Sequence, residues 1–450
     1  TAYDVAVMAL HAAEDKTYRG ASVAGLAMPW GSDVNADSLG DGYHRVWGRD
    51  LYEQATGLIA AGDTAQARRM AQFLWNDQFI ATATAGAGTT YQPGAFPRYS
   101  PVSGVAGAGG QELGCCEQLD EDADAIILAW MTGLTDPGTY AKITLTANHI
   151  QHTGPDTTER WEEQYGKSPS SIAAEIAGLI TAAAIARDNG DTASARSWEA
   201  TADSWRSSLH GWTYTTNGYW GAHRYFERIN PSGDPNDTSQ ICFQEGCYYV
   251  HDVTDLGFLE LVRLGVRASN DPDVTASLAA TVTTRDGNST LRVRMPNGDL
   301  YFHRYPHDSY GESNTDCSGW PDNAGNNHGR LWPVLSGERG EYAVANGQPA
   351  AVYLRSMADS TNAGHSLPEQ IWDRSDISCF RYGTPTGSAA PLMWAEGQYV
   401  RLAQNMTAGH DLETPSIVTT RYRRATTGSD PAQEQQSRHR AAGPNDDAGA

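Results

Sequence analysis

Apolar residues recur at helical spacing along most of the chain. Ile172, Ile176, Leu179 and Ile180, for example, repeat every three or four positions, which is the spacing of one face of an α-helix. The same criterion predicts about twelve helices, and therefore an all-α fold, near residues 4–14, 50–62, 64–78, 121–134, 136–150, 170–188, 192–208, 253–264, 272–283, 331–345, 348–360 and 388–404.

Short and long connections alternate between these helices. Short ones such as "AGDT" (61–64) and "DNGDT" (188–192) favour antiparallel helical hairpins. The long ones run through roughly 15–48, 79–120, 151–169, 209–252, 284–330 and 361–387. Six hairpins with their long loops at one end predict an (α/α)6 barrel, a six-hairpin toroid in which the loops build a pocket.

Two of the long connections contain signals for β-hairpins. The stretches "WTYTTNGYWGAHRYF" (212–226) and "LRVRMPNGDLYFHRY" (291–305) are each centred on Asn-Gly, a dipeptide typical of tight hairpin turns. After about residue 424 the composition becomes polar, as in "SDPAQEQQSRHRAAGPNDDAGA", which predicts a disordered tail. We therefore divide the chain into a barrel domain, 1–423, and a tail, 424–450.

Charge and composition narrow the class of partner. The formal net charge of -22 argues against nucleic acid, because phosphate binding needs basic patches. No apolar run is long enough to predict a bilayer crossing, so no membrane partner is expected. The 13 Trp and 21 Tyr residues suit packing and also stacking on the apolar faces of sugars.

The cysteines indicate disulfides more readily than a metal site. None forms a CxxC pair or has His at zinc spacing, and their even number permits disulfides in an oxidising compartment, so we expect a secreted protein. Cys242 and Cys247 could close a small loop, while the other pairings, and buried free thiols, remain open. A structural Ca²⁺ is compatible with the acidic loops, although no EF-hand-like spacing supports one. The six are Cys115, Cys116, Cys242, Cys247, Cys317 and Cys379.

The stretch "ERWEEQYGKSPSSIAAEIAGL" (159–179) crowds carboxylates beside an indole. Ser168 and Pro169 are typical of a helix start, so Glu162 and Glu163 are predicted in the loop before that helix. Trp161 would give Glu162 an apolar wall that favours the protonated acid, the form that protonates a leaving group. The alternative is an acidic cluster favoured by the helix dipole.

A glycosidase needs a second carboxylate and groups that grip the sugar. Glu369, in "HSLPEQIWD", lies in a late loop and could be that carboxylate or an ordinary loop glutamate. In "DGYHRVWGRDLYEQATGL" a loop becomes a helix. There Arg49 and Asp50, beside Trp47 and Tyr43, could clamp a sugar, although Asp50 could also be only an N-cap.

Six motifs in order resemble one known family. The chain contains "YHRVWGRD", "ERWEEQYGKSPSSIAAEIAGL", "HRYPHDSYGE", "GRLWPVLSGERG", "LPEQIWD" and "PLMWAEGQYVRL". From about residue 3 to 405 it is similar to the catalytic domain of glycoside hydrolase family 15, in its bacterial form of glucoamylases and glucodextranases. The resemblance implies an (α/α)6 barrel and an inverting exo-hydrolase that releases β-D-glucose from the non-reducing ends of α-glucans.

The resemblance also implies residue roles. Glu162 matches the general acid and Glu369 the general base. The expected sugar-binding residues are Tyr43, Trp47, Arg49, Asp50, Trp161, Glu163 and Arg304, with Trp332 and Trp394 as pocket walls and Gln118 and Asp120, in "EQLDEDAD", as secondary candidates. No cofactor is required in this family. The expected partner is an α-glucan such as starch, a maltooligosaccharide or dextran, bound by a monomer.

Some features depart from the family pattern or leave alternatives open. Fungal members have a tryptophan shortly before the Gln-x-Asp element, where this chain has "GCCEQLD". The preference for α-1,4 or α-1,6 linkages therefore stays open, and with it the alternative of a glucodextranase. Bacterial members usually carry an upstream β-sandwich domain, which we expect to be missing from this chain. A disaccharide phosphorylase is disfavoured because Glu369 would repel phosphate. A non-catalytic glucan-binding protein is disfavoured because both carboxylates are present.

Overall fold

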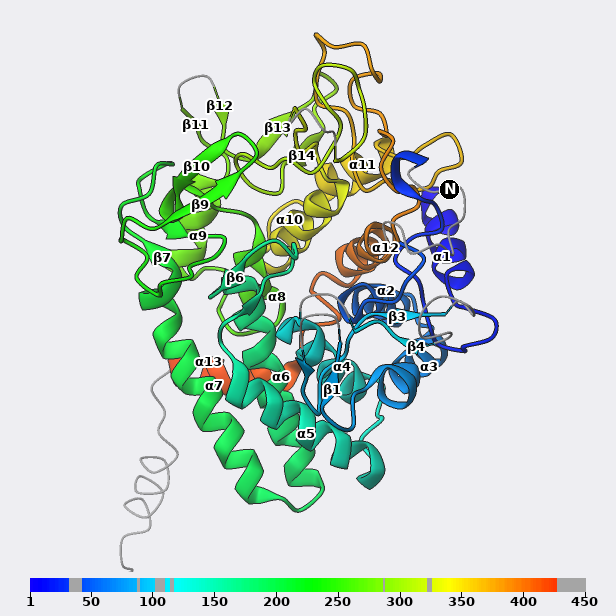
Figure 1. The fold of residues 1–450 in the computed structure, drawn as a ribbon, viewed down its shortest axis with the longest axis vertical. Coiled ribbons are helices and arrows are strands. Elements are labelled where there is room, and N and C mark those ends of the chain that lie inside the picture. Colours follow the sequence, from blue (N-terminus) through cyan, green and yellow to red (C-terminus); the bar gives the residue numbers. More distant parts are fainter. Residues whose placement is uncertain are drawn as a thin grey trace, which may run out of the picture.

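A closed ring of six helices forms the centre of the molecule. The computed structural model describes residues 1–31, 43–86, 90–101, 110–113, 117–285, 288–321 and 326–426. Each helix of the ring contacts the next, and the last contacts the first (Figure 1). In order, the ring consists of α2 (Gly48–Ala60), α4 (Leu119–Met131), α6 (Pro169–Asp188), α8 (Glu260–Arg263), α10 (Pro333–Ala345) and α12 (Met393–Ala408).

A second set of helices alternates with the ring along the chain. α5 contacts α4 and α6, α7 contacts α6, and α11 contacts α10 and α12, so the predicted (α/α)6 barrel is confirmed. A further helix, α13 (Ser416–Thr426), contacts α6 and was not predicted. The alternating set is α1 (Ala2–Ala12), α3 (Thr64–Phe73), α5 (Pro137–Thr153), α7 (Thr192–Thr213), α9 (Pro272–Ala280) and α11 (Ala351–Asp359).

The ring helices are buried over most of their surface, including many charged and polar side chains. α6 is long and apolar enough to cross a membrane by length and composition, contrary to the sequence prediction, but 94% of that window is buried inside the fold. Where α2 and α12 cross, a Cβ on Gly57 would lie 2.7 Å from the backbone of Gly397. Glycine at this crossing therefore permits close contact between the two helices.

Short antiparallel hairpins decorate the loops between helices. The pairs are β1 (Thr84–Ala85) with β2 (Thr90–Tyr91), β3 (Tyr99–Ser100) with β4 (Gly110–Gln111), β5 (Thr157–Thr158) with β6 (Tyr165–Gly166), β7 (Tyr214–Thr215) with β8 (Tyr225–Phe226), β9 (Gln240–Phe243) with β10 (Gly246–Tyr249), β11 (Thr284–Arg285) with β12 (Asn288–Ser289), and β13 (Arg292–Arg294) with β14 (Leu300–Phe302). Short helical turns occur at η1 (Pro29–Gly31), η2 (Leu74–Gln78), η3 (Val250–Asp252) and η4 (Gly257–Leu259).

The predicted hairpins are confirmed, but not as tight two-residue turns. Tyr214 pairs with Phe226, and Arg294 pairs with Leu300, so a longer connection surrounds each Asn-Gly. The helix predicted over 64–78 ends at Phe73 and continues as the π-helical turn η2, and the one predicted over 253–264 is divided between η4 and α8. These breaks are set by packing between elements, which local periodicity does not record.

Two disulfides join loops of the described chain. Cys242 pairs with Cys247 across the β9–β10 hairpin, one of the alternatives that the sequence left open, and Cys317 pairs with Cys379. Cys115 and Cys116 lie outside the described residues, as do residues 427–450 of the predicted tail. The residues 424–426 assigned to that tail continue α13.

Candidate active site

The first candidate carboxylate lies in the hairpin turn between β5 and β6. The amide of Glu162 donates to the carbonyl of Glu159 over 2.8 Å, and that of Glu159 donates to the carbonyl of Gln164 over 3.0 Å. Glu162 itself has a φ of 64°, a left-handed conformation that non-glycine residues seldom adopt and that clusters at functional sites. Its side chain is 29% exposed, so this carboxylate is only partly buried.

The neighbouring carboxylates hold that turn in shape. Glu159 accepts the amides of Trp161 (2.8 Å) and Glu163 (3.3 Å). Arg228 then donates to Glu159 over 2.6 Å and to Glu163 over 2.8 Å. Glu163 also accepts from Arg304 over 2.9 Å. The crowded glutamates therefore have different tasks, because Glu159 organises the backbone while Glu163 joins two buried arginines.

The pKa values of Glu159 and Glu163 are shifted in opposite directions. Burial raises the pKa of Glu159, although the charge of Arg228 opposes that rise. Burial would also raise the pKa of Glu163, but the charges of Arg304 and Arg228 outweigh it and hold this pKa below its ordinary value. Glu163 is therefore the ionised partner of both arginines and is poorly suited to donate a proton.

Arg49, at the start of α2, lies beside Glu162. Its Nη1 is 4.0 Å from Oε1 of Glu162, and its Nε donates to Asp120 of α4 over 3.1 Å. It also donates to the side chain of Gln118. Asp50 is the third residue of α2, whose N-cap is Trp47, so the N-cap alternative for Asp50 is wrong.

Asp50 is instead a buried carboxyl beside Arg49 and Glu162. Burial raises the pKa of Asp50 to about 7, although the charge of Arg49 opposes this rise. The N-cap position of α6 is Ser168, followed by Pro169 as predicted, but the serine side chain makes no capping hydrogen bond. Asp50 therefore does not cap α2, and the side chain of Ser168 does not cap α6.

The second candidate carboxylate is deeply buried. Glu369 is 2% exposed, and its Oε1 accepts a hydrogen bond from the hydroxyl of Tyr43. That hydroxyl lies 2.6 Å from the hydroxyl of Tyr310. Burial raises the pKa of Glu369 to about 8, while the hydrogen bond from Tyr43 and the charge of Arg304 oppose the rise. Oε2 of Glu369 has no hydrogen-bond partner among the described residues.

Aromatic side chains connect the two carboxylates. The guanidinium of Arg304 lies 5.0 Å from the ring of Tyr310 and 5.1 Å from that of Trp161. Since Tyr310 contacts Tyr43 beside Glu369, and Arg304 binds Glu163 next to Glu162, one continuous set of contacts links both candidate catalytic residues. The structure therefore brings together segments that are 207 positions apart (369 − 162).

Four predicted tryptophans surround this network. Trp161 stacks on Trp394 with ring centres 5.9 Å apart and meets Trp332 edge-on at 5.4 Å. Its indole nitrogen donates to Asp255 over 3.1 Å. The buried indole nitrogens of Trp47, Trp332 and Trp394 have no partner among the described residues. Buried indole nitrogens usually have a hydrogen-bond partner, so these three are exceptions at the site.

Sequence reasoning missed the residues that support the site. Glu159 stood in the quoted stretch but received no role, and Arg228 was not singled out. Asp308 binds Arg304 over 2.6 Å, and Tyr305 donates to Glu163; both stand in "RYPHDSY", where only the arginine was assigned. Within the described residues, no group of three or more His, Cys, Asp or Glu is arranged to hold a metal ion.

Comparisons with known proteins agree with this arrangement. The family model described as "Glycosyl hydrolases family 15" matches residues 1–404. A glucoamylase of Clostridium sp. (strain G0005) is 39% identical over 425 residues, which cover 93% of this chain and 55% of that protein. A crystal structure of a bacterial glucoamylase complexed with acarbose has a TM-score of 0.81 and 37% identity, covering 94% of this chain and 57% of the other.

A more distant structure shows the same fold. The glucoamylase of Hormoconis resinae has a TM-score of 0.61 at 16% identity, and the match covers 91% of this chain and 73% of that one. The chain thus spans a little over half the length of the two more similar relatives.

Proposed function

This chain belongs to glycosyl hydrolase family 15, and we propose on that premise that it is an inverting, exo-acting α-glucan hydrolase. It releases β-D-glucose from the non-reducing ends of starch-type oligo- and polysaccharides, as a glucan 1,4-α-glucosidase. The observation that carries the proposal is the single network that contains Glu162 on the β5–β6 turn and Glu369 before α12. Hydrolysis of a glycosidic bond needs two such carboxylates on opposite sides of the sugar.

The proposed mechanism assigns each carboxylate one proton transfer. Glu162 protonates the glycosidic oxygen, because it matches the family's general acid and its side chain is partly exposed. Glu369 activates a water on the opposite face through Oε2, which has no other partner among the described residues. Arg49, Asp50 and Arg304 hold the hydroxyls of the terminal glucose. The reaction requires a carboxylate separation of about 6.5–9.5 Å, which admits the water, and no cofactor.

The high pKa of Glu369, about 8, would by itself favour the opposite assignment, with Glu369 as the acid. The base role is supported by the match of Glu369 to the family's general base and by the hydrogen bond that it accepts. The hydroxyl of Tyr43 donates to Glu369, and donation to a carboxylate stabilises its ionised form. A general base with a raised pKa is also a stronger proton acceptor once it is ionised.

Proton NMR of fresh digests tests the function directly. Initial β-glucose from maltose supports an inverting glucoamylase. Initial α-glucose would mean retention and would contradict the roles of both carboxylates. A clear preference for isomaltose, again with β-glucose, would identify a glucodextranase instead.

We further propose that the protein is secreted and acts as a monomer. The two disulfides within the described residues are typical of oxidising compartments. Sedimentation of the full chain tests the oligomeric state, with a monomer expected. Activity in the culture medium compared with the cell extract tests secretion, and activity confined to the cells would contradict it.

A further inference from the structure

A pocket of about 550 Å³ lies beside the catalytic network and does not include Glu162 or Glu369. Its walls come from the β7–β8 loop, the β9–β10 and β11–β12 hairpins, the segment after β14, and the loops around residues 328–330 and 373–374. Its volume is in the range of about 300–1,000 Å³ that is typical of small-molecule sites. The pocket is therefore large enough to bind a ligand of its own.

Aromatic side chains from separate loops line this pocket. Tyr219, Trp220, Tyr248 and Tyr305 all belong to its wall. The ring of Tyr248 stacks on His307 with centres 3.4 Å apart, so its orientation is fixed before any ligand arrives. Aromatic rings combine a broad apolar face with polar edges, and this combination suits the CH face and hydroxyl rim of a pyranose.

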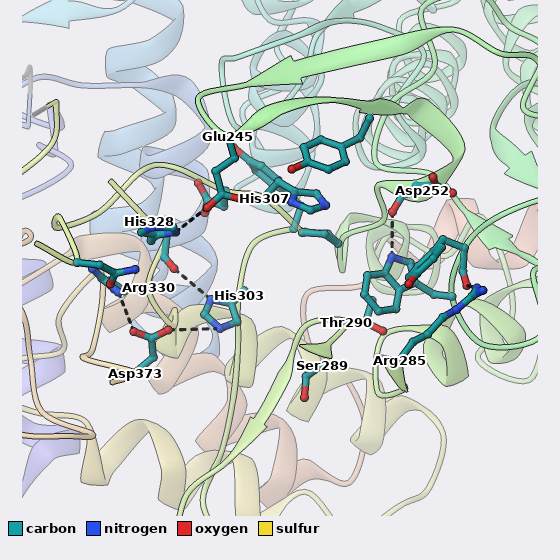
Figure 2. Close-up of a pocket in the computed structure, with 18 of the residues that line it drawn as sticks. Glu245, Asp252, Arg285, Ser289, Thr290, His303, His307, His328, Arg330 and Asp373 are labelled. Atoms are coloured by element: carbon teal, nitrogen blue, oxygen red, sulfur yellow. Dashed lines mark hydrogen bonds and ion pairs between the residues drawn. The ribbon is translucent and has the colours of Figure 1, made fainter. Parts of the chain in front are cut away.

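The charged groups of the pocket nearly balance. Figure 2 shows Glu245, His307 and His328 on one side, and Asp252 and Arg285 on the other. Phosphate binding would need a clear excess of basic groups, and no described cluster fits a metal ion. The balance therefore favours a neutral, hydroxyl-rich ligand. The charged residues are Glu245, Asp252, Asp308 and Asp373 against Arg285, Arg330 and Arg374.

The rim of the pocket is built before a ligand binds. Glu245 lies at the turn between β9 and β10, which the Cys242–Cys247 disulfide closes. Its carboxylate is 2.8 Å from Nδ1 of His328 and 3.4 Å from Nδ1 of His307. These contacts fix the hairpin against two distant loops, so binding would cost little additional ordering.

One layer of side chains separates this pocket from the catalytic network. Tyr305 and Asp308 line the pocket, while the first donates to Glu163 and the second binds Arg304. We propose that the pocket is an auxiliary binding site for a neutral α-glucan segment, distinct from the catalytic pocket. The ligand class rests on the proposed function, and the site would hold a polymer close to the catalytic centre.

Calorimetric titration with maltoheptaose tests this proposal on the full chain, in a Glu369→Gln background that prevents hydrolysis. Two binding sites per chain are expected. Tyr248→Ala should weaken one of them roughly tenfold, the effect of losing a well-packed ring. Tyr249→Ala is the matched control, because Tyr249 is the next residue of β10, is exposed and does not line the pocket.

Tyr219→Ala is a second variant, on a different loop, in case the first does not fold. In the otherwise unchanged enzyme, normal maltose turnover shows that a pocket variant is folded. A single binding site in the parent, or two sites that neither pocket variant weakens, would overturn the proposal while leaving the hydrolase assignment intact. Failure of the unsubstituted chain to hydrolyse maltose would instead refute the proposed function.

Discussion

The hydrogen bond from Tyr43 to Glu369 offers the sharpest test of the catalytic assignment. Tyr43→Phe removes the hydroxyl that donates to Oε1 of Glu369 and keeps the ring. Because this bond opposes the effect of burial on the carboxyl, its loss should raise the pKa of Glu369 above its present value of about 8. The substitution removes one hydrogen bond to Glu369 and leaves Glu369 itself in place.

The size of this effect follows from the charge on the acceptor. A hydrogen bond to a charged group contributes about 1.5–3 kcal/mol, and one pKa unit corresponds to about 1.4 kcal/mol. The pKa of Glu369 should therefore rise by roughly one to two. A general base is active only when ionised, so its activity is lost as pH falls through its pKa. The acid limb of the pH profile of kcat/KM on maltose should move up by the same amount.

The direction of the result separates the two possible roles of Glu369. If Glu369 were the general acid, the alkaline limb would move up and the acid limb would stay in place. Tyr310→Phe is the matched control, because Tyr310 contacts the hydroxyl of Tyr43 and Tyr43 in turn donates to Glu369. A smaller shift is expected there. An unchanged acid limb in Tyr43→Phe would refute the base role.

Three further predictions test chemistry and stability. Glu162→Gln and Glu369→Gln should each lower maltose turnover by roughly 10²–10⁴-fold. Only Glu162→Gln should retain activity on α-glucosyl fluoride, because the fluoride leaving group needs little protonation. Equal losses of activity on the fluoride would contradict the two roles. Burial raises the pKa of Glu175 well above its ordinary value, so the stability of the fold decreases as pH rises above the pKa of this carboxyl in the unfolded chain. Glu175→Gln should therefore raise Tm at pH 7, and the Tm difference from the unsubstituted chain should narrow at pH 4. A Tm difference that is the same at both pH values would refute this. Replacing Cys317 and Cys379 by serine opens a loop of 62 residues and should lower the free energy of unfolding, measured with denaturant, by roughly 4 kcal/mol. Removing the hairpin disulfide is the control and should lower it by roughly 2 kcal/mol. Equal losses would argue against loop entropy as the cause.

The barrel was predictable because its helices repeat a local pattern. Each buried face of α2 or α6 leaves a periodic trace in the sequence, and alternation of short and long loops indicates hairpins. α13 left a weaker trace, since it is rich in polar residues. It packs against α6 and joins α7 through ion pairs of Arg421 with Glu199 and Asp203. The division at η4 and α8 is decided by tertiary contacts, so no window of sequence contains it.

The candidate site was predictable only where a motif carried the signal. Glu162 and Glu369 were assigned from a resemblance, because neither residue differs locally from an ordinary loop glutamate. Arg228 lies between quoted motifs, and a solvated arginine would read the same in sequence. Only the fold shows that it is fully buried and joined to Glu159 and Glu163.

The positions of these supporting residues explain why the turn can present Glu162 in a left-handed conformation. Backbone strain persists where surrounding contacts over-determine it, and here Glu159 binds two amides of the turn while Arg228 binds Glu159. Arg228 lies in the connection between β8 and β9 and not in a helix of the ring. The geometry of the acid is therefore set by loops that pack on one another, together with Arg49 of the barrel helix α2, which donates to the carbonyl of Arg160 over 2.9 Å and lies beside Glu162.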